Sequence, residues 1–168
     1  DSKPERYMYI SDIDRINSFT LSESERNDWT LLDIQAGIPA IIAATQEAFV
    51  PQMVNLDLIG AVNFKKGCYP GQEVVARVHY LGKIKQRMFV VKYDGKEQVL
   101  PGVKVFISGQ DGKAVGTVVQ SAAINSEQLL QVVLQTAVVV DKADIRLDSV
   151  DGEKLIVDSQ PYTILEEE

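Results

Sequence analysis

The chain contains one cysteine, one histidine and one tryptophan among its 168 residues. A single cysteine cannot form an internal disulfide, and this fits a reducing compartment, so we expect a cytoplasmic protein. Zinc and iron–sulfur sites need three or four ligands, which Cys68 and His79 cannot supply. We therefore expect no metal site in this chain.

Long hydrophobic runs are also missing. The longest, such as residues 137–140, are much shorter than the roughly 20 apolar residues that cross a bilayer. The polar opening DSKP, residues 1–4, does not have the charged and then apolar layout of a signal peptide. We expect no membrane insertion, and the 45% of hydrophobic residues is enough to build a buried core.

The net charge of −7 is unevenly distributed. Residues 65–87, called here the basic segment, hold six basic residues and one acid, a local balance of +5 that leaves −12 for the remainder. The six are Lys65, Lys66, Arg77, Lys83, Lys85 and Arg87. Such a concentration indicates an anionic contact, for example with a polyglutamate tail, a phosphate group or a short RNA. Solvated charges on a helix and a strand are the alternative interpretation.

The basic segment begins with residues 65–77, KKGCYPGQEVVAR, which contain the only cysteine. Gly67 and Gly71 bracket Cys68, and glycine allows backbone conformations that other residues resist, so we expect a tight connection. The start of a helix and the lysine pair both favour an anion, so the pKa of the Cys68 thiol should lie below its unperturbed value of about 8.5. This predicts a nucleophilic or metal-binding thiolate. A small buried hydrophobic residue is the alternative.

Residues 71–81 have the spacing of a short helix. The apolar residues of one stripe are Val74, Val75, Val78 and Leu81. Glu73 and Arg77 lie four residues apart and can pair. Eight helical steps of about 1.5 Å carry His79 roughly 12 Å from the turn, so we expect a surface or interface residue and not a partner of Cys68.

Residues 66–73, KGCYPGQE, resemble the signature K-G-C-Y-x-G-Q-E of the YgfZ-type folate-binding proteins. These are relatives of the glycine-cleavage T-protein, an aminomethyltransferase that uses tetrahydrofolate. All seven defined positions match, and residues 32–39, Pro51-Gln52 with Asn55-Leu56, and residues 75–77 resemble the same family in the same order. Relatives carry a further region before this point, so the chain is expected to be the C-terminal part of a longer protein.

The resemblance implies a folate-binding accessory protein for the assembly or repair of iron–sulfur enzymes, including those that modify tRNA. Cys68 would then act as a thiolate that makes a transient bond to iron, to sulfur or to a partner thiol. Lys65 and Lys66 would lower its pKa, and Gly67 and Gly71 would shape the turn. The residues expected to orient the thiolate are Tyr69, Gln72, Glu73 and Arg77. Two alternatives are a folate-dependent one-carbon (aminomethyl) transferase, and a binding module in which Cys68 is merely buried.

The resemblance also implies that tetrahydrofolate lies in a central cavity, walled in part by the segment around Pro51 and Asn55. The candidate contacts are Trp29, Asp33 and Gln35. In the T-protein relatives an acid at about the position of Gln35 helps to hold the pterin, whereas a glutamine accepts through one atom and carries no charge. Asp33 is the other candidate for this role, although its side chain points about 200° away from Gln35 on a helix.

That helix is expected to start at Ser22, since Ser22 and Glu25 form a capping-box pattern, and to run towards Gly37. Trp29, Leu32, Ala36 and Ile38 are expected to form its apolar side. Residues 7–10 are the one strand-like run before it.

After Gly82 the sequence changes to short apolar or alternating runs separated by turn signals. The runs are residues 84–93, 103–108, 114–121, 129–135, 143–147, 154–157 and 162–165. They predict a small antiparallel barrel or sandwich, with Asp151-Gly152 as the best type I′ hairpin turn, and the resemblance to the T-protein superfamily implies the β-barrel. The fold class is therefore α+β. Residues 1–82 would be the C-terminal part of the T-protein-like folate-binding α/β domain, and residues 83–168 the barrel.

Overall fold

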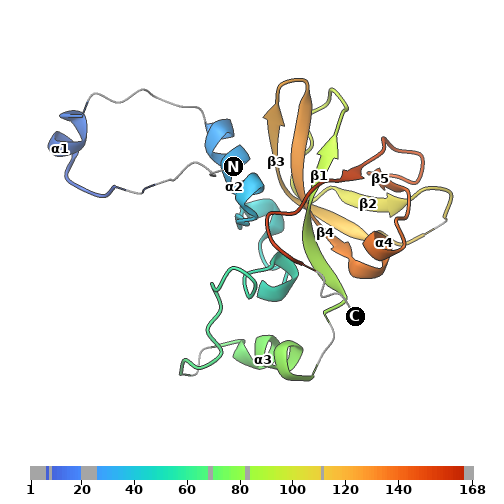
Figure 1. Ribbon diagram of the computed structural model, residues 1–168, viewed down its shortest axis with the longest axis horizontal. Helices are drawn as coiled ribbons and strands as arrows, with labels where there is room; N and C mark the ends of the chain where they lie inside the picture. Colours follow the sequence, from blue (N-terminus) through green and yellow to red (C-terminus); the bar gives the residue numbers. More distant parts are fainter. Residues whose placement is uncertain are drawn as a thin grey trace.

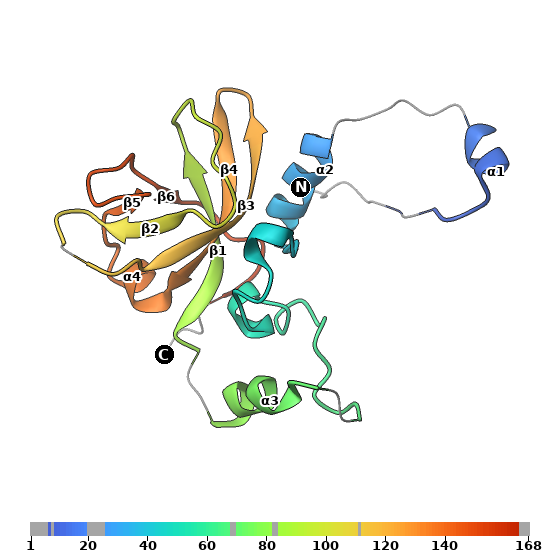
Figure 2. The same cartoon turned by 180° about the vertical axis from the view of Figure 1, so that it is seen from behind.

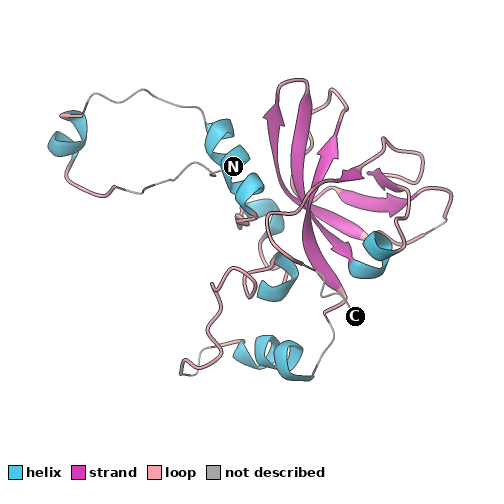
Figure 3. Ribbon diagram, in the orientation of Figure 1, coloured by secondary structure: helices cyan, strands magenta, loops and turns pink. Residues whose placement is uncertain are grey.

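Helical segments come first along the chain, as far as residue 81, and strands dominate thereafter (Figure 1; Figure 3). The computed structural model describes residues 7, 9–19, 26–67, 70–81, 84–110 and 112–164. The helical elements are α1 (Ile13–Asn17), α2 (Arg26–Ala36), the 3-10 helices η1 (Ala43–Thr45) and η2 (Pro51–Val54), α3 (Gln72–Leu81) and α4 (Thr136–Val140). The strands are β1 (Gln86–Tyr93), β2 (Lys104–Ile107), β3 (Gly116–Ile124), β4 (Glu127–Gln135), β5 (Ile145–Leu147) and β6 (Ile156–Val157).

The strands form one sheet in the order β5-β2-β3-β4-β1-β6, and all neighbours pair antiparallel. The sheet curls until its two edge strands, β5 and β6, approach each other. This is shown by a β-bridge between Arg146 of β5 and Lys154, just before β6. The amide of Leu155 also donates a hydrogen bond to the carbonyl of Ile145 at 2.9 Å. The α+β class and the nearly closed antiparallel barrel are thus confirmed. The expected domain boundary falls at Gly82 and Lys83, outside the described residues, and stays a prediction.

The long strands β1 and β4 are buried on both faces. Val91 and Leu130 point into the barrel core, while the outer face is covered by helical segments. α2 lies along β3 and β4 (Figure 2), and its Ile34 packs against Leu129. Val54 of η2 packs against Met88 at another point of the same face. The segments before the barrel are therefore joined to it by apolar packing.

The prediction of which residues form the apolar side of α2 is wrong in part. Trp29 and Ile38 are 49% and 40% exposed, and the fully buried residue is Ile34. The apolar residues of this helix are spread around its axis, so spacing alone did not select the side that faces the sheet. The expected cap at Ser22 and Glu25 lies outside the described residues.

Two expected strands are not formed. Tyr7, Tyr9 and Ile10 are exposed and lie in no strand, and Met8 is outside the described residues. Residues 162–164 are also not a strand, and Leu165 lies outside the described range. Both runs have strand-like composition, but a strand also needs a neighbouring edge with which to pair.

The turn at Asp151-Gly152 is not a two-residue type I′ turn. The left-handed residue of this connection is Asp148, with φ 65°, whereas Gly152 does not have a positive φ. A Cβ at Gly152 would collide with the main chain of Leu147, so glycine is required here by a close approach. The two-residue turn of the barrel lies at Asn125-Ser126, between β3 and β4.

Candidate functional site

The signature stretch leads into α3 as the sequence predicts. Gly71 has φ +83°, which favours glycine, and the helix begins at the next residue, Gln72. Cys68 and Tyr69 lie outside the described residues. The described residues on either side of them are exposed: Lys65, Lys66, Gly67, Pro70 and Gly71.

The loop that contains Cys68 starts beside the end of the helix that it leads into. Phe64 stacks on His79 in the last turn of α3, with ring centroids 3.7 Å apart and an angle of 9° between the rings. Tyr80 meets the same two rings edge-on. The chain therefore passes the C-terminal turn of α3 at Phe64 and enters the same helix at Gln72. His79 is exposed, as expected.

α3 is anchored on the side of Val75, which is 6% exposed. The main-chain carbonyl of Val75 accepts a hydrogen bond from Nε2 of Gln52 at 2.6 Å, and Gln52 is fully buried. Val74, expected on the apolar stripe, is instead 54% exposed. Although Glu73 and Arg77 are both described, the structure shows no ion pair between them, so that expected contact is absent.

A buried ion pair fixes the segment that carries Gln52. Arg87 of β1 donates from Nη1 and Nη2 to the two carboxylate oxygens of Asp57, at 2.7 and 3.1 Å. The same Nη1 donates to the main-chain carbonyl of Gln52 at 2.8 Å. Arg87 is 8% exposed, so it adds no accessible charge to the basic segment. The exposed cations of that segment, among the described residues, are Lys65, Lys66, Arg77 and Lys85.

Asn55 joins the same segment to β1 and to Tyr162, near the C-terminal end of the described residues. It has φ 62°, donates from Nδ2 to the carbonyl of Met88 at 2.7 Å and contacts the hydroxyl of Tyr162 at 3.3 Å. That hydroxyl donates to the carbonyl of Gly37 at 2.9 Å, and burial raises the pKa of Tyr162. Gln52 and Asn55 thus make internal contacts, and neither side chain reaches an open surface.

The three candidate folate contacts all lie on α2 but do not share one face. Trp29 and Asp33 are four residues apart and lie on the same side of the helix. Gln35 points elsewhere, into a cavity of about 440 Å³ beside the β3–β4 turn, lined also by Lys92 and Asp158. Neither Trp29 nor Asp33 lines that cavity. Their role in folate binding stays a prediction.

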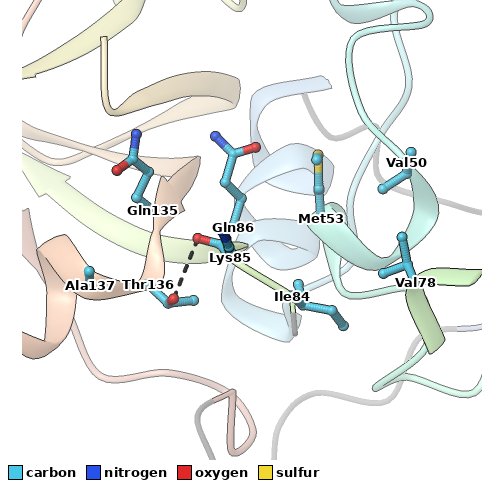
Figure 4. A pocket seen from close by; sticks show the side chains of 9 residues that line it. All are labelled: Val50, Met53, Val78, Ile84, Lys85, Gln86, Gln135, Thr136 and Ala137. Atoms are coloured by element: carbon cyan, nitrogen blue, oxygen red, sulfur yellow. Dashed lines mark hydrogen bonds between the residues drawn. The ribbon is translucent and has the colours of Figure 1, made fainter. Parts of the chain in front are cut away.

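A separate cavity of about 560 Å³ borders α3 (Figure 4). It lies where η2 and α3 meet the start of β1 and the junction of β4 with α4. Its walls combine aliphatic side chains with two glutamines, a threonine and Lys85. Sequence reasoning missed it, because its walls come from four separate segments that only the fold brings together.

Neither a metal cluster nor a membrane helix occurs in the part of the chain that the structure describes. No three His, Cys, Asp or Glu residues of that part could hold a metal ion. None of its helices has the length and apolar character to cross a bilayer.

Comparison with curated proteins finds relatives, two of which are described here, whereas no family model matches. The "tRNA-modifying protein YgfZ" of Blochmanniella pennsylvanica is 36% identical over 162 residues, which cover 87% of this chain and 48% of the relative. The protein of the same name from Klebsiella pneumoniae is 31% identical over 173 residues, covering 95% of this chain and 51% of the relative. The chain thus spans about half the length of these curated relatives.

Proposed function

This chain is of the YgfZ type, and on that premise we propose that it serves tRNA modification as an accessory protein for iron–sulfur enzymes. Both relatives named above are called tRNA-modifying proteins, and this supports a role connected with tRNA modification. The finer proposal, that the role is exerted through cluster assembly or repair, comes from the signature around Cys68.

One observation carries the proposal: the signature stretch follows Phe64, which stacks on the last turn of α3, and leads into the first turn of the same helix. α3 begins at Gln72, four residues after Cys68, and the Phe64–His79 stack holds the other end of the loop. Free N–H groups at a helix start, together with two exposed lysines, favour a thiolate over a thiol. The thiolate of Cys68 makes a transient bond to iron, to sulfur or to a partner thiol.

In this proposal Lys65 and Lys66 stabilise the thiolate by their charge. Gln72, Glu73 and Arg77 lie in the first two turns of α3, where their side chains can orient the loop. Glu73 and Arg77 are both exposed and can meet a partner protein. Tyr69 completes the group proposed to orient the thiolate.

Tetrahydrofolate is the proposed ligand, and the full protein forms its cavity, to which this chain contributes Trp29, Asp33 and Gln35. The half-exposed ring of Trp29 can stack on a pterin, and Asp33 lies on the same side of α2. The aminomethyltransferase alternative is less well supported, because Gln35 stands where the T-protein relatives carry an acid.

The test of the thiolate is complementation of cells that lack the native protein. Cys68→Ala should abolish the activity of a cluster-dependent tRNA-modifying enzyme, while the variant protein stays folded. Lys65→Gln together with Lys66→Gln should raise the pH at which Cys68 reacts with an alkylating agent, because two positive charges are removed. Full rescue by Cys68→Ala would reduce Cys68 to a packing residue and contradict the proposal.

Folate binding has its own test through Trp29, the only tryptophan of this chain. Added tetrahydrofolate should quench the fluorescence of Trp29 in the full protein, and this part of the change should be missing in Trp29→Phe. Gln35→Glu should tighten binding if this position faces the pterin, since a carboxylate accepts two hydrogen bonds. Unchanged fluorescence at saturating ligand would remove Trp29 from the folate site.

A further inference from the structure

The cavity beside α3 has two walls of different chemistry (Figure 4). Met53 of η2 and Val78 of α3 form an aliphatic wall, which Ile84 extends. The carboxamides of Gln86 and Gln135 lie opposite. A volume of about 560 Å³ is in the range of pockets that hold small organic molecules.

The two glutamines are placed as a pair. Gln86 is the first residue of β1 and Gln135 the last of β4, and they are directly opposite each other in the ladder. Side chains of such partners project from the same face of a sheet. Among the described residues, neither carboxamide has a hydrogen-bond partner within the protein. Together they present donors and acceptors side by side.

We propose that this cavity binds an adenine nucleotide. A glutamine carboxamide can form a bidentate pair with the N6 and N7 edge of adenine, which offers one donor and one acceptor. Met53 and Val78 would pack against the ring from the aliphatic wall, and methionine adapts well to such surfaces. Lys85, which is exposed and lines the cavity, would meet the phosphate.

The inference deepens the proposed role in tRNA modification and rests on it for the source of the nucleotide, an unpaired adenine of RNA. Lys65, Lys66 and Arg77 are exposed cations of the basic segment and can hold further phosphates of the same strand. A free adenine nucleotide has the same chemistry and is the other source. The candidate folate contacts Trp29, Asp33 and Gln35 do not line this cavity, so the two ligands do not compete for one site.

The test is a titration of the full protein with adenosine monophosphate, followed through the side-chain amide resonances of Gln86 and Gln135. These resonances should shift, and cytidine monophosphate should shift them less. Gln86→Met and Gln135→Met, which keep the size and remove the amide, should each weaken binding about tenfold. Gln110→Met, in an exposed loop, is the matched control and should bind normally. Absence of binding, or equal binding by all these variants, overturns the proposal.

A second titration separates the two sources. A short oligoadenylate should bind more tightly than the monophosphate, and its affinity should fall as salt rises and in Lys85→Gln. Equal affinity of the two would assign the site to a free nucleotide. Complementation with the Cys68→Ala variant tests the proposed function independently of this cavity. If that variant fails to complement and no adenine compound binds, the adenine site is contradicted while the proposed function stands.

Discussion

Gln52 donates a hydrogen bond from its Nε2 to the main-chain carbonyl of Val75 across 2.6 Å, and both residues are buried. Val75 is the one buried side chain among residues 72–80 of α3. The carboxamide oxygen of the same side chain, Oε1 of Gln52, is buried and has no hydrogen-bond partner among the described residues. The position of α3, and with it the end of the Cys68 loop, therefore depends on one glutamine that lies 23 residues away in the sequence.

Replacing Gln52 should loosen α3 without unfolding the barrel. Gln52→Met removes the donor and should cost about 1–3 kcal/mol, because the bond to Val75 is buried. Gln52→Glu has the same size but places a carboxylate beside a carbonyl, so it should cost more. Hydrogen exchange should accelerate at the amides of α3, with β3 and β4 as the internal control. Equal acceleration in the barrel would show that Gln52 supports the whole fold.

The ion pair of Asp57 and Arg87 should show strong coupling in a double-mutant cycle. The side chains are only 11% and 10% exposed, so removal of one partner leaves a buried charge. Asp57→Ala or Arg87→Met alone should cost about 3–5 kcal/mol, and the double variant less than the sum.

Lys92 and Asp158, 43% and 25% exposed, provide the comparison for that cycle. Breaking this more exposed pair should change the free energy of unfolding by only about 0–1 kcal/mol. Chemical denaturation measures the free energy of unfolding for the variants of both ion pairs. Similar costs for the two pairs would contradict the importance of burial.

The barrel could be predicted from the sequence because its signals are local. Alternating runs and turn residues located β1 to β4, and the helical spacing of residues 71–81 predicted α3 with a start one residue too early. The short strands β5 and β6 were predicted longer than they are, since pairing rather than composition decides where a strand ends.

The contacts that position the site could not be predicted in this way. Gln52 meets Val75, and Asp57 meets Arg87, over 23 and 30 residues of sequence, and a lone glutamine or aspartate gives no signal of its partner. Helical periodicity placed Val74 and Val75 on one stripe, yet only Val75 is buried. Periodicity identifies a helix, but the residue that faces the protein depends on tertiary packing.

Alanine substitutions at Gly37 and Gly60 separate the cost of a steric clash from the cost of a left-handed backbone conformation. Both are left-handed, with φ of +70° and +73°, but a Cβ at Gly37 would collide with the ring of Tyr162, whereas at Gly60 nothing lies within 4 Å. Gly60→Ala should cost about 1–2 kcal/mol for the conformation alone. Gly37→Ala should cost clearly more and disturb the hydrogen bond from Tyr162. Thermal unfolding compares the two variants, and equal losses would mean that Tyr162 moves aside freely.

Phe64 should protect the signature loop from proteolysis. Trypsin cleaves after lysine, and Lys65 and Lys66 are exposed and directly follow the stacked ring of Phe64. Stacking contributes about 0.5–1.5 kcal/mol, so its loss in Phe64→Ala should raise the rate of loop opening and cleavage by up to roughly tenfold. Cleavage after Lys113, in an exposed loop elsewhere, should stay unchanged. If cleavage of the loop is equally fast before and after the substitution, the stack does not hold it.

Tyr93 should make the protein less stable at alkaline pH. Burial is the largest cause that raises the pKa of Tyr93 from 10.0 to about 12. The hydrogen bond to Glu153 and the negative charges of Glu153 and Glu97 raise it further. Below about pH 10 the phenol is neutral in the folded and unfolded states, so its contribution to stability is complete. As pH rises from about 10 to about 12, the unfolded chain loses this proton while the folded chain keeps it, and stability falls.

Tyr93→Phe should therefore flatten this alkaline decline in the free energy of unfolding. Tyr80→Phe, at a residue that is 66% exposed, should leave the decline unchanged. Glu153→Gln removes one acceptor charge, so it should shift the phenolate absorbance of Tyr93 to lower pH. If Tyr93→Phe follows the same pH profile as the parent protein, the proton on Tyr93 does not contribute to its stability.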